Sequence, residues 1–339
     1  MSDTVPTMTA PAKPAAAPLL SCEGLSVAFP RYGAAPHVAL KDVDVELRAG
    51  EVLGLVGESS SGKTMLARAI MRLVPTPGRI SAGTVRFDGK DLATLDEEAL
   101  RKVRGRDIAM VISNPRGELD PLQTVGQQIG NVLRYHLGLD KRAARERALD
   151  LLKQVSIPDP QRRLNAYPHE LSGGMAQRVV IAIALACSPR LIISDDATSG
   201  LDVTVQAQVL ELIRKLVIES GTSMMFITRD IGITAHYCDR IAILYAGEIV
   251  EVARRETFFD DPQHPYTVLL LAAFAHNERL RRYWLGEDKA RENTGPSAVG
   301  CPFQNRCVRV QERCRSDHPA LVERKPGHFV RCHYPVERS

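Results

Sequence analysis

The chain has 339 residues, of which 44% are hydrophobic and 25% are charged, a composition typical of soluble globular proteins. No apolar run reaches the roughly 18–20 residues that a membrane span needs, so no membrane-spanning helix is expected; "VVIAIALAC" (179–187) is among the longest runs. The net charge of +4 is small and by itself selects neither nucleic acid nor a lipid surface as a partner.

The predicted elements alternate between strands and helices along most of the chain. Residues 1–18 are rich in Pro, Ala and Thr and have no signal-peptide pattern, so we expect a disordered tail on a cytosolic protein. Alternating or short buried apolar runs predict strands at 20–29, 37–50, 51–57, 83–89, 107–112, 190–195, 223–228 and 240–247. Helical spacing predicts helices at 64–74, 123–155, 175–187, 204–220 and 230–238. This alternation implies parallel strands with helical crossovers, the α/β class.

A phosphate-binding loop is predicted at "GESSSGKT" (57–64), which follows a buried strand and begins a helix. It matches G-x-x-x-x-G-K-[ST], a pattern whose backbone N–H groups wrap a phosphate at a helix N-terminus. Lys63 is expected to reach the β- and γ-phosphates of ATP, and the Thr64 hydroxyl to hold Mg²⁺. Ser60 stands where many such loops have glycine, which costs little only if its φ is negative. The predicted ATP-binding residues of this loop are Gly57, Ser59, Ser60, Ser61, Gly62, Lys63 and Thr64.

Two adjacent carboxylates end the apolar run "LIISDD" (191–196). A strand that carries acids at its C-terminal end is typical of a Walker B motif, in which Asp195 would orient Mg²⁺. Asp196 stands at the position of the acid that polarises the attacking water. Together with the phosphate loop, these carboxylates predict a site for ATP and Mg²⁺.

The stretch "LSGGMAQR" (171–178) lies between the phosphate loop and the two carboxylates. With this order and spacing, residues 20–275 resemble the ABC-type ATPase family. The resemblance implies a RecA-like α/β subdomain, an antiparallel β subdomain and a helical subdomain at about 114–170. It also implies a dimer in which this signature contacts the ATP held by the partner subunit. The residues added by the resemblance are Phe29 for adenine stacking, Ser172, Gly173, Gly174 and Gln177 in the signature, and Asp202 in the D-loop.

Three positions depart from the family's hydrolytic machinery. Ser113 replaces the glutamine expected after the strand at 107–112, and it is too short to reach Mg²⁺ and water. Asp196 replaces the catalytic glutamate and is one methylene shorter, a displacement that can cost about 10²-fold in rate. Arg229 replaces the switch histidine, and a guanidinium can only donate hydrogen bonds. We therefore expect this chain's own site to bind ATP but to hydrolyse it slowly, beside a competent partner ATPase.

Three further stretches resemble the ATP-binding subunits of oligopeptide and dipeptide importers, a group that includes nickel importers. They are "LDVTVQAQVLELI" (201–213), "HPYTVLLLAAF" (264–274) and the cysteine-containing end of the chain. The resemblance implies a second ATPase subunit, two transmembrane permease subunits and an extracytoplasmic substrate-binding protein, at the cytoplasmic face of the membrane and without nucleic acid. The permease contact is expected near Ser113 and 114–140.

Two other functions stay open at this point, a soluble ABC ATPase and a nucleotide sensor. The cargo is also open between peptides, nickel and other small solutes, because a nucleotide-binding subunit does not touch the cargo.

Four of the seven cysteines lie near the end of the chain, with the spacing C-x5-C-x6-C-x17-C. Without an export signal, clustered cysteines favour a metal over disulfides, and the spacing does not fit C-x2-C zinc knuckles. Four thiolates on one compact segment suit a [4Fe–4S] cluster, which members of the importer group are reported to carry. Zinc is the main alternative, and disulfides or free thiols are the others. The expected ligands are Cys301, Cys307, Cys314 and Cys332.

The predicted organisation has four parts: a tail at 1–18, an ABC ATPase domain at 19–275, a linker at 276–299 and a cysteine-rich extension at 300–339. The extension has too few apolar residues for a core of its own, so a cluster would staple it. The sequence reveals no chain of hydrogen-bonding residues from these cysteines to the nucleotide, so we expect a structural role for them.

Overall fold

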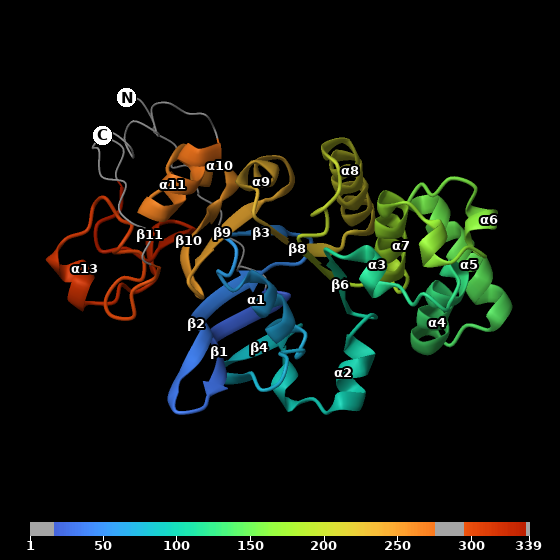
Figure 1. The fold of residues 1–339 in the computed structure, drawn as a ribbon, viewed down its shortest axis with the longest axis horizontal. Helices are drawn as coiled ribbons and strands as arrows, with labels where there is room; N and C mark the ends of the chain where they lie inside the picture. Colours follow the sequence, from blue (N-terminus) through green and yellow to red (C-terminus); the bar gives the residue numbers. More distant parts are fainter. Residues whose placement is uncertain (1–16, 275–294, 337–339) are drawn as a thin grey trace, which may run out of the picture.

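The computed structural model describes residues 17–274 and 295–336, which form two β-sheets flanked by helices (Figure 1). Most of the tail predicted at 1–18 and of the linker predicted at 276–299 lies outside the described residues. One apolar cluster joins the main sheet to the helical region, and a second joins it to the smaller sheet. The α/β class predicted from the sequence is confirmed.

The larger sheet has eight strands in the order β11-β12-β10-β9-β3-β8-β7-β6. The strands from β9 to β6 run parallel, and β10 pairs antiparallel with β9. Every residue of β7 and β8 is buried, as expected for parallel strands covered on both faces. The bounds are β3 Val52–Val56, β6 Ile108–Ile112, β7 Leu191–Asp195, β8 Ser223–Thr228, β9 Arg240–Tyr245, β10 Glu248–Arg254, β11 Val322–Lys325 and β12 His328–Val330.

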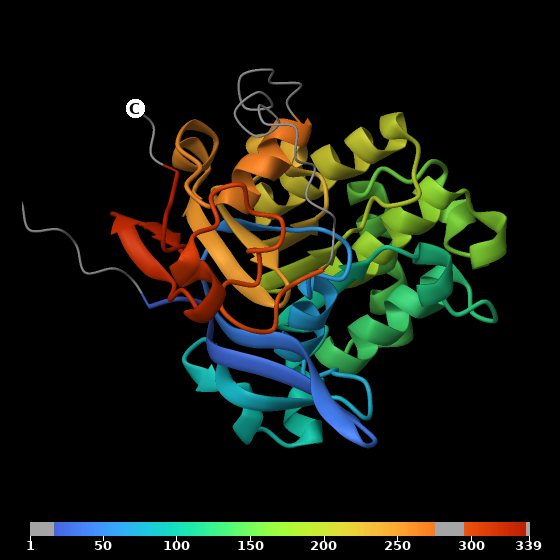
Figure 2. The same ribbon diagram turned by 60° about the vertical axis from the view of Figure 1, so that its left-hand side comes forward.

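The smaller sheet has four antiparallel strands in the order β2-β1-β4-β5. Burial alternates along the second half of β2, and the inward side chains of Leu40, Val43 and Val45 join the second apolar cluster. Figures 1 and 2 both show helix α1 lying between this sheet and the main one. The bounds are β1 Leu20–Arg31, β2 Ala34–Leu47, β4 Arg79–Phe87 and β5 Lys90–Asp91, with α1 at Lys63–Ile70.

Helices form a lobe beyond β6, where Figure 1 shows α4, α5 and α6 grouped at one end of the molecule. Helix α4 begins at a capping box in which the Thr124 and Gln127 side chains each accept a backbone N–H. The lobe comprises α3 Pro115–Glu118, α4 Val125–Leu137, α5 Lys141–Gln154, α6 Pro160–Arg163, the 3₁₀ turn η2 Pro168–Glu170 and α7 Gly173–Leu185. The other helices of the described residues are η1 Leu92–Thr94, α2 Glu97–Val103, α8 Val203–Ser220, α9 Ile231–Tyr237, α10 Arg255–Asp260, α11 Pro265–Phe274 and α13 Glu312–Ser316.

Several boundaries differ from the prediction. The helix predicted at 64–74 ends at Ile70, because Arg72 takes a left-handed conformation with φ +55°. The stretch 123–155 is two helices, since Gly138 turns the chain at φ +66°. Strand β10 was not predicted; it is buried along almost its whole length and so shows no alternation of polar and apolar residues.

The C-terminal segment, residues 295–336, extends the main sheet, because β12 pairs with β10 and β11 pairs with β12. Figure 2 shows this segment, in red, lying along β10, in orange. Two buried acids of β10 hold it there. Glu251 lies 2.7 Å from His328 Nε2, and Glu248 lies 2.8 Å from His318 Nε2. Buried carboxylates are stable only when they are paired, so these contacts attach the segment to the sheet.

Candidate functional site

The phosphate loop (57–64) connects β3 to α1 and rests on the turn between β9 and β10. The Gly247 N–H donates to the Ser61 carbonyl oxygen over 2.8 Å. A Cβ atom at Gly57 would lie 2.2 Å from the Leu244 carbonyl oxygen, so only glycine allows the loop to approach this turn so closely. The loop is therefore held by strands that lie far from it in the sequence.

Lys63 folds back into the loop that precedes it. Its Nζ donates to the carbonyl oxygens of Gly57 at 2.7 Å and Glu58 at 2.8 Å, and to Ser61 Oγ at 3.4 Å. Burial lowers the pKa of this ammonium, whereas the carboxylates of Asp196 and Asp195 act in the opposite direction. The ammonium lies inside the concave loop, next to the place where a phosphate would bind.

Ser60 has φ +65°, in the left-handed region. A negative φ would have made serine at this position cost little, but the observed φ is positive. The conformation costs a non-glycine residue about 1–2 kcal/mol. The loop keeps its shape at this cost because the contacts of Ser61, Lys63 and Gly57 surround it.

A cavity of about 390 Å³ opens beside the phosphate loop. Its wall on the β2 side includes His37 and Val38, which sequence reasoning missed. Phe29 does not line it; the ring packs against Gly78, although Phe29 pairs with His37 in the sheet. The full lining is His37, Val38, Ala39, Ser60, Gly62, Lys63, Thr64, Met65, Ala246, Gly247 and Pro296. The volume and the polar loop suit a nucleotide-sized ligand.

Asp195 ends β7 and is buried next to the start of α1. The Thr64 side chain lies next to its carboxylate. Burial raises the pKa of Asp195, and the Thr64 side chain partly offsets this shift. A hydroxyl and a carboxylate that meet beside a phosphate loop are the oxygen ligands that Mg²⁺ prefers. The structure thus brings together the two residues predicted to hold Mg²⁺.

Asp196 follows at φ +51°, and its Oδ2 lies 3.2 Å from Nη2 of Arg229. The same Arg229 nitrogen donates to Ser199 Oγ over 3.4 Å. The parallel pairing of β7 with β8 explains the contact, because both residues follow the carboxyl ends of adjacent strands. Two of the three positions that depart from the ABC pattern therefore pair with each other.

The other predicted residues lie around this edge of the sheet. Ser113 is exposed directly after β6, whose Ile112 is paired with Asp195. Ser172 caps α7 by accepting the Met175 N–H over 3.3 Å, and Asp202 caps α8 by accepting the Val205 N–H over 3.0 Å.

The signature residues do not line the phosphate-loop cavity of their own chain. Gly173 and Gly174 form the first turn of α7, and a Cβ at Gly174 would lie 2.8 Å from Val205 Cγ1. Gln177 is fully buried, and both of its side-chain amide atoms lack a hydrogen-bond partner within the described residues. Ser59 is exposed on the phosphate loop.

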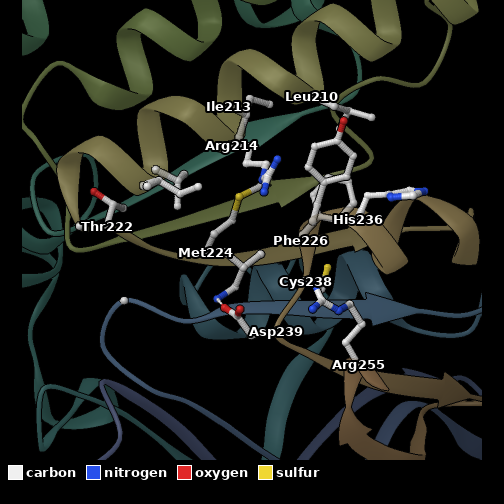
Figure 3. A pocket seen from close by; sticks show the side chains of 16 residues that line it. Leu210, Ile213, Arg214, Thr222, Met224, Phe226, His236, Cys238, Asp239 and Arg255 are labelled. Atoms are coloured by element: carbon white, nitrogen blue, oxygen red, sulfur yellow. Dashed lines mark hydrogen bonds between the residues drawn. The ribbon is translucent and has the colours of Figure 1, made fainter. Parts of the chain in front are cut away.

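A second cavity, of about 290 Å³, lies between α8, α9 and the main sheet (Figure 3). Its apolar lining includes Leu210 from α8 and Met224 and Phe226 from β8, and Arg214 and Arg255 also line it. None of the predicted ATP-binding residues lines this cavity. It is thus separate from the phosphate loop.

The four C-terminal cysteines line one small cavity of about 10 Å³. All are thiols rather than disulfides. Burial raises the pKa of Cys301 to about 11 and that of Cys332 to about 12. Among the residues that the structure describes, no group of three or more His, Cys, Asp or Glu side chains is arranged to hold a metal ion. The donor set fits a thiolate-bound metal in chemistry, but its present arrangement does not form such a site.

The parallel sheet, the phosphate loop and the acids on the neighbouring strand together define a phosphate-loop ATPase with an ABC signature. A family model described as "ABC transporter" matches residues 40–199. A second model, "Oligopeptide/dipeptide transporter, C-terminal region", matches residues 250–314.

Similar proteins agree with these matches. The dipeptide transport ATP-binding protein DppD of Escherichia coli is 40% identical over 94% of this chain and 97% of its own length. A Brucella abortus relative, named for peptide import ATP binding, is 44% identical over 93% of this chain and 96% of its own length. The dimeric ATP-binding cassette MJ0796, bound to ADP and phosphate, superposes with a TM-score of 0.62 at 29% identity, over 70% of this chain and 98% of that one.

The chain therefore belongs to the ABC transporter family, as one of its ATP-binding proteins. In the described part of the chain, no helix combines the length and apolar character needed to cross a bilayer.

Proposed function

We propose that this chain is the ATP-binding subunit of an ABC importer for peptides, peripheral on the cytoplasmic face of the cell membrane. The names of the two relatives support a peptide cargo, as does the C-terminal match. Lys63 and Thr64 line one cavity, and Asp195 lies next to both of them, which supports binding of ATP with Mg²⁺. Nickel or another small solute is the alternative cargo, since this subunit does not contact it.

The proposed complex contains a second ABC ATPase, two permease subunits and an extracytoplasmic substrate-binding protein. ATP would lie between this chain's phosphate loop and the partner's signature, and the partner's ATP would face Ser172, Gly173 and Gly174. A permease contact near Ser113 and 114–140 agrees with the exposure of Ser113 after β6. A soluble ABC ATPase would instead purify without membrane subunits.

We further propose that the site on this chain binds ATP but hydrolyses it slowly. The observation that supports this is the ion pair between Asp196 and Arg229, at 3.2 Å. A carboxylate engaged by a guanidinium is a weaker base toward water, and Arg229 has no acceptor to offer. The competent site would use the partner's phosphate loop and catalytic glutamate with this chain's signature.

Neutralising each acid in turn within the purified complex tests this asymmetry. We expect Asp196→Asn to leave ATP hydrolysis nearly unchanged, because the carboxylate contributes little to it. Neutralising the partner's catalytic glutamate should lower the rate by about 10²-fold or more, the usual size of a general-base contribution. An equal loss from both changes contradicts the asymmetry.

We also propose that Cys301, Cys307, Cys314 and Cys332 bind an iron–sulfur cluster, with zinc as the alternative. Their convergence on one cavity supports this assignment. A bound cluster would stabilise the thiolates against the effect of burial and would cross-link the segment. It would serve as a structural cross-link in a segment with few apolar residues.

A further inference from the structure

A residue of the cysteine segment contacts the phosphate loop directly. Arg306 donates from Nη1 to Glu58 Oε2 and from Nη2 to Glu58 Oε1, each over 2.8 Å. Glu58 is the second residue of the phosphate loop, and Arg306 immediately precedes Cys307. This two-point contact corrects the expectation that no hydrogen-bonding residues link the cysteines to the nucleotide site.

The guanidinium of Arg306 is held in place by three aromatic rings. Its carbon lies 5.9 Å from the ring centres of Tyr245 and Tyr266, and 5.6 Å from that of Phe303. The side chain is only 17% exposed. Stacking on aromatic faces and a planar two-point pair are both properties of arginine that lysine does not share.

The same aromatic group also holds the backbone of the loop. The Tyr266 hydroxyl accepts a hydrogen bond from the Glu58 N–H over 3.0 Å. Tyr266 belongs to α11 and is fully buried. Pro296, from the described start of the C-terminal segment, lines the cavity beside the loop. Glu58 is therefore fixed at its side chain and at its backbone by residues from the last quarter of the chain.

We infer that Arg306 is a positioning residue for ATP binding, which holds the phosphate loop in its binding shape through Glu58. The inference rests on the proposed binding of ATP at this loop. A loop whose N–H groups converge before the phosphate arrives loses less entropy on binding than a loop that must first be ordered. Without the pair, the loop is held by fewer contacts, and we expect ATP affinity to fall about tenfold, as for a charge-assisted hydrogen bond.

The test compares variants of the full-length chain by titration with a fluorescent ATP analogue and Mg²⁺. Arg306→Gln and Glu58→Gln should each weaken binding about tenfold, and the double variant should be no weaker than either one, as for coupled residues. The matched control is Arg313→Gln, which removes an exposed pair with Asp317 (2.9 Å) in the same segment and should bind like wild type.

Amide hydrogen exchange of the nucleotide-free chain separates positioning from general destabilisation. Arg306→Gln should speed exchange in the phosphate loop. Exchange in α4 and α5, which belong to the helical lobe beyond β6, should stay unchanged. If Arg306→Gln does not fold, Glu58→Gln is the test variant, because it leaves the aromatic rings and Arg306 in place.

The outcomes are distinguishable. If wild type binds ATP and both single variants bind it equally well, the positioning role is wrong. Additive losses in the double variant also contradict it. If the wild-type chain itself does not bind ATP, the proposed function fails instead.

Discussion

Arg229 and Asp196 form an ion pair that is partly exposed to solvent, with side-chain exposures of 55% and 29%. Pairs of this kind add little to stability, commonly less than about 1 kcal/mol. The consequence of the pair is therefore chemical, because it engages the carboxylate at the position where the family places its base. Asp196 is also held at φ +51°, a conformation tolerated by aspartate better than by bulkier residues.

Restoring both residues of the family pattern should raise hydrolysis. In Asp196→Glu with Arg229→His, the side chain of the acid is one methylene longer and can reach the attacking water. The imidazole can accept as well as donate hydrogen bonds. We expect the isolated chain to release phosphate from ATP about 10- to 100-fold faster than wild type. Single-turnover phosphate release measures this rate.

Arg229→Gln is the control for the double change. It removes the ion pair without supplying an imidazole or a longer acid, so its rate should rise less than that of the double variant. If the double variant gains no activity although it binds ATP normally, the slow site has another cause.

At the scale of elements, the phosphate loop depends on the turn between β9 and β10. Parallel strands bring their carboxyl ends to one edge, where the loop after β3, the acids after β7 and Arg229 after β8 meet. The Leu244 carbonyl oxygen in β9 and the Gly247 N–H in the turn that follows it contact the loop. The shape of the loop is thus set by contacts from strands that follow it by more than half the chain.

Gly57→Ala should displace the loop, because the added Cβ would meet the Leu244 carbonyl oxygen at 2.2 Å. A shift of about 1 Å in a binding group can cost about 10²-fold, and we expect ATP affinity to fall by that order. The titration described for Arg306 measures it.

Gly50→Ala is the matched control for Gly57→Ala. This glycine has φ +73°, and no atom lies within 4 Å of the added Cβ. The substitution therefore costs about 1 kcal/mol of stability from its conformation alone and should leave ATP affinity unchanged. Normal ATP affinity in Gly57→Ala would show that the turn between β9 and β10 does not set the shape of the phosphate loop.

At the scale of the whole molecule, several contacts join the C-terminal segment to the ATPase domain, three of which bear on the site. Strand β12 adds to the main sheet, the buried acids Glu248 and Glu251 pair with histidines of the segment, and Arg306 reaches Glu58. A metal bound by the cysteines would stabilise the loop that carries Arg306, since Cys307 is its neighbour. The segment therefore links the cysteine cavity to the phosphate loop through Arg306.

Metal content tests the assignment of the cysteines. Full-length protein purified without oxygen should contain iron and acid-labile sulfide and should absorb visible light as a brown species. Cys307→Ser and Cys332→Ser should lose the iron, whereas Cys187→Ser, a half-buried thiol outside the segment, should retain it. Zinc in place of iron selects the alternative, and the absence of both metals rejects a metal site.

The sequence alone identified the α/β class, the phosphate loop, the paired acids and the signature. These features are predictable because each depends on residues that are close in the sequence. Lys63 donates hydrogen bonds to the backbone of its own loop, and Asp195 ends an apolar strand. The three departures from the family pattern were visible for the same reason, since each occupies a fixed place after a strand.

Tertiary structure decided what those residues contact. His37, rather than Phe29, lines the cavity, because the pairing of β1 with β2 and the packing on Gly78 set which ring faces inward. Arg306 reaches Glu58 only because β12 joins β10 and brings the last segment to the phosphate loop. No local pattern distinguishes this arginine from the many others, since a contact between residues 248 positions apart depends on the folding of all that lies between them.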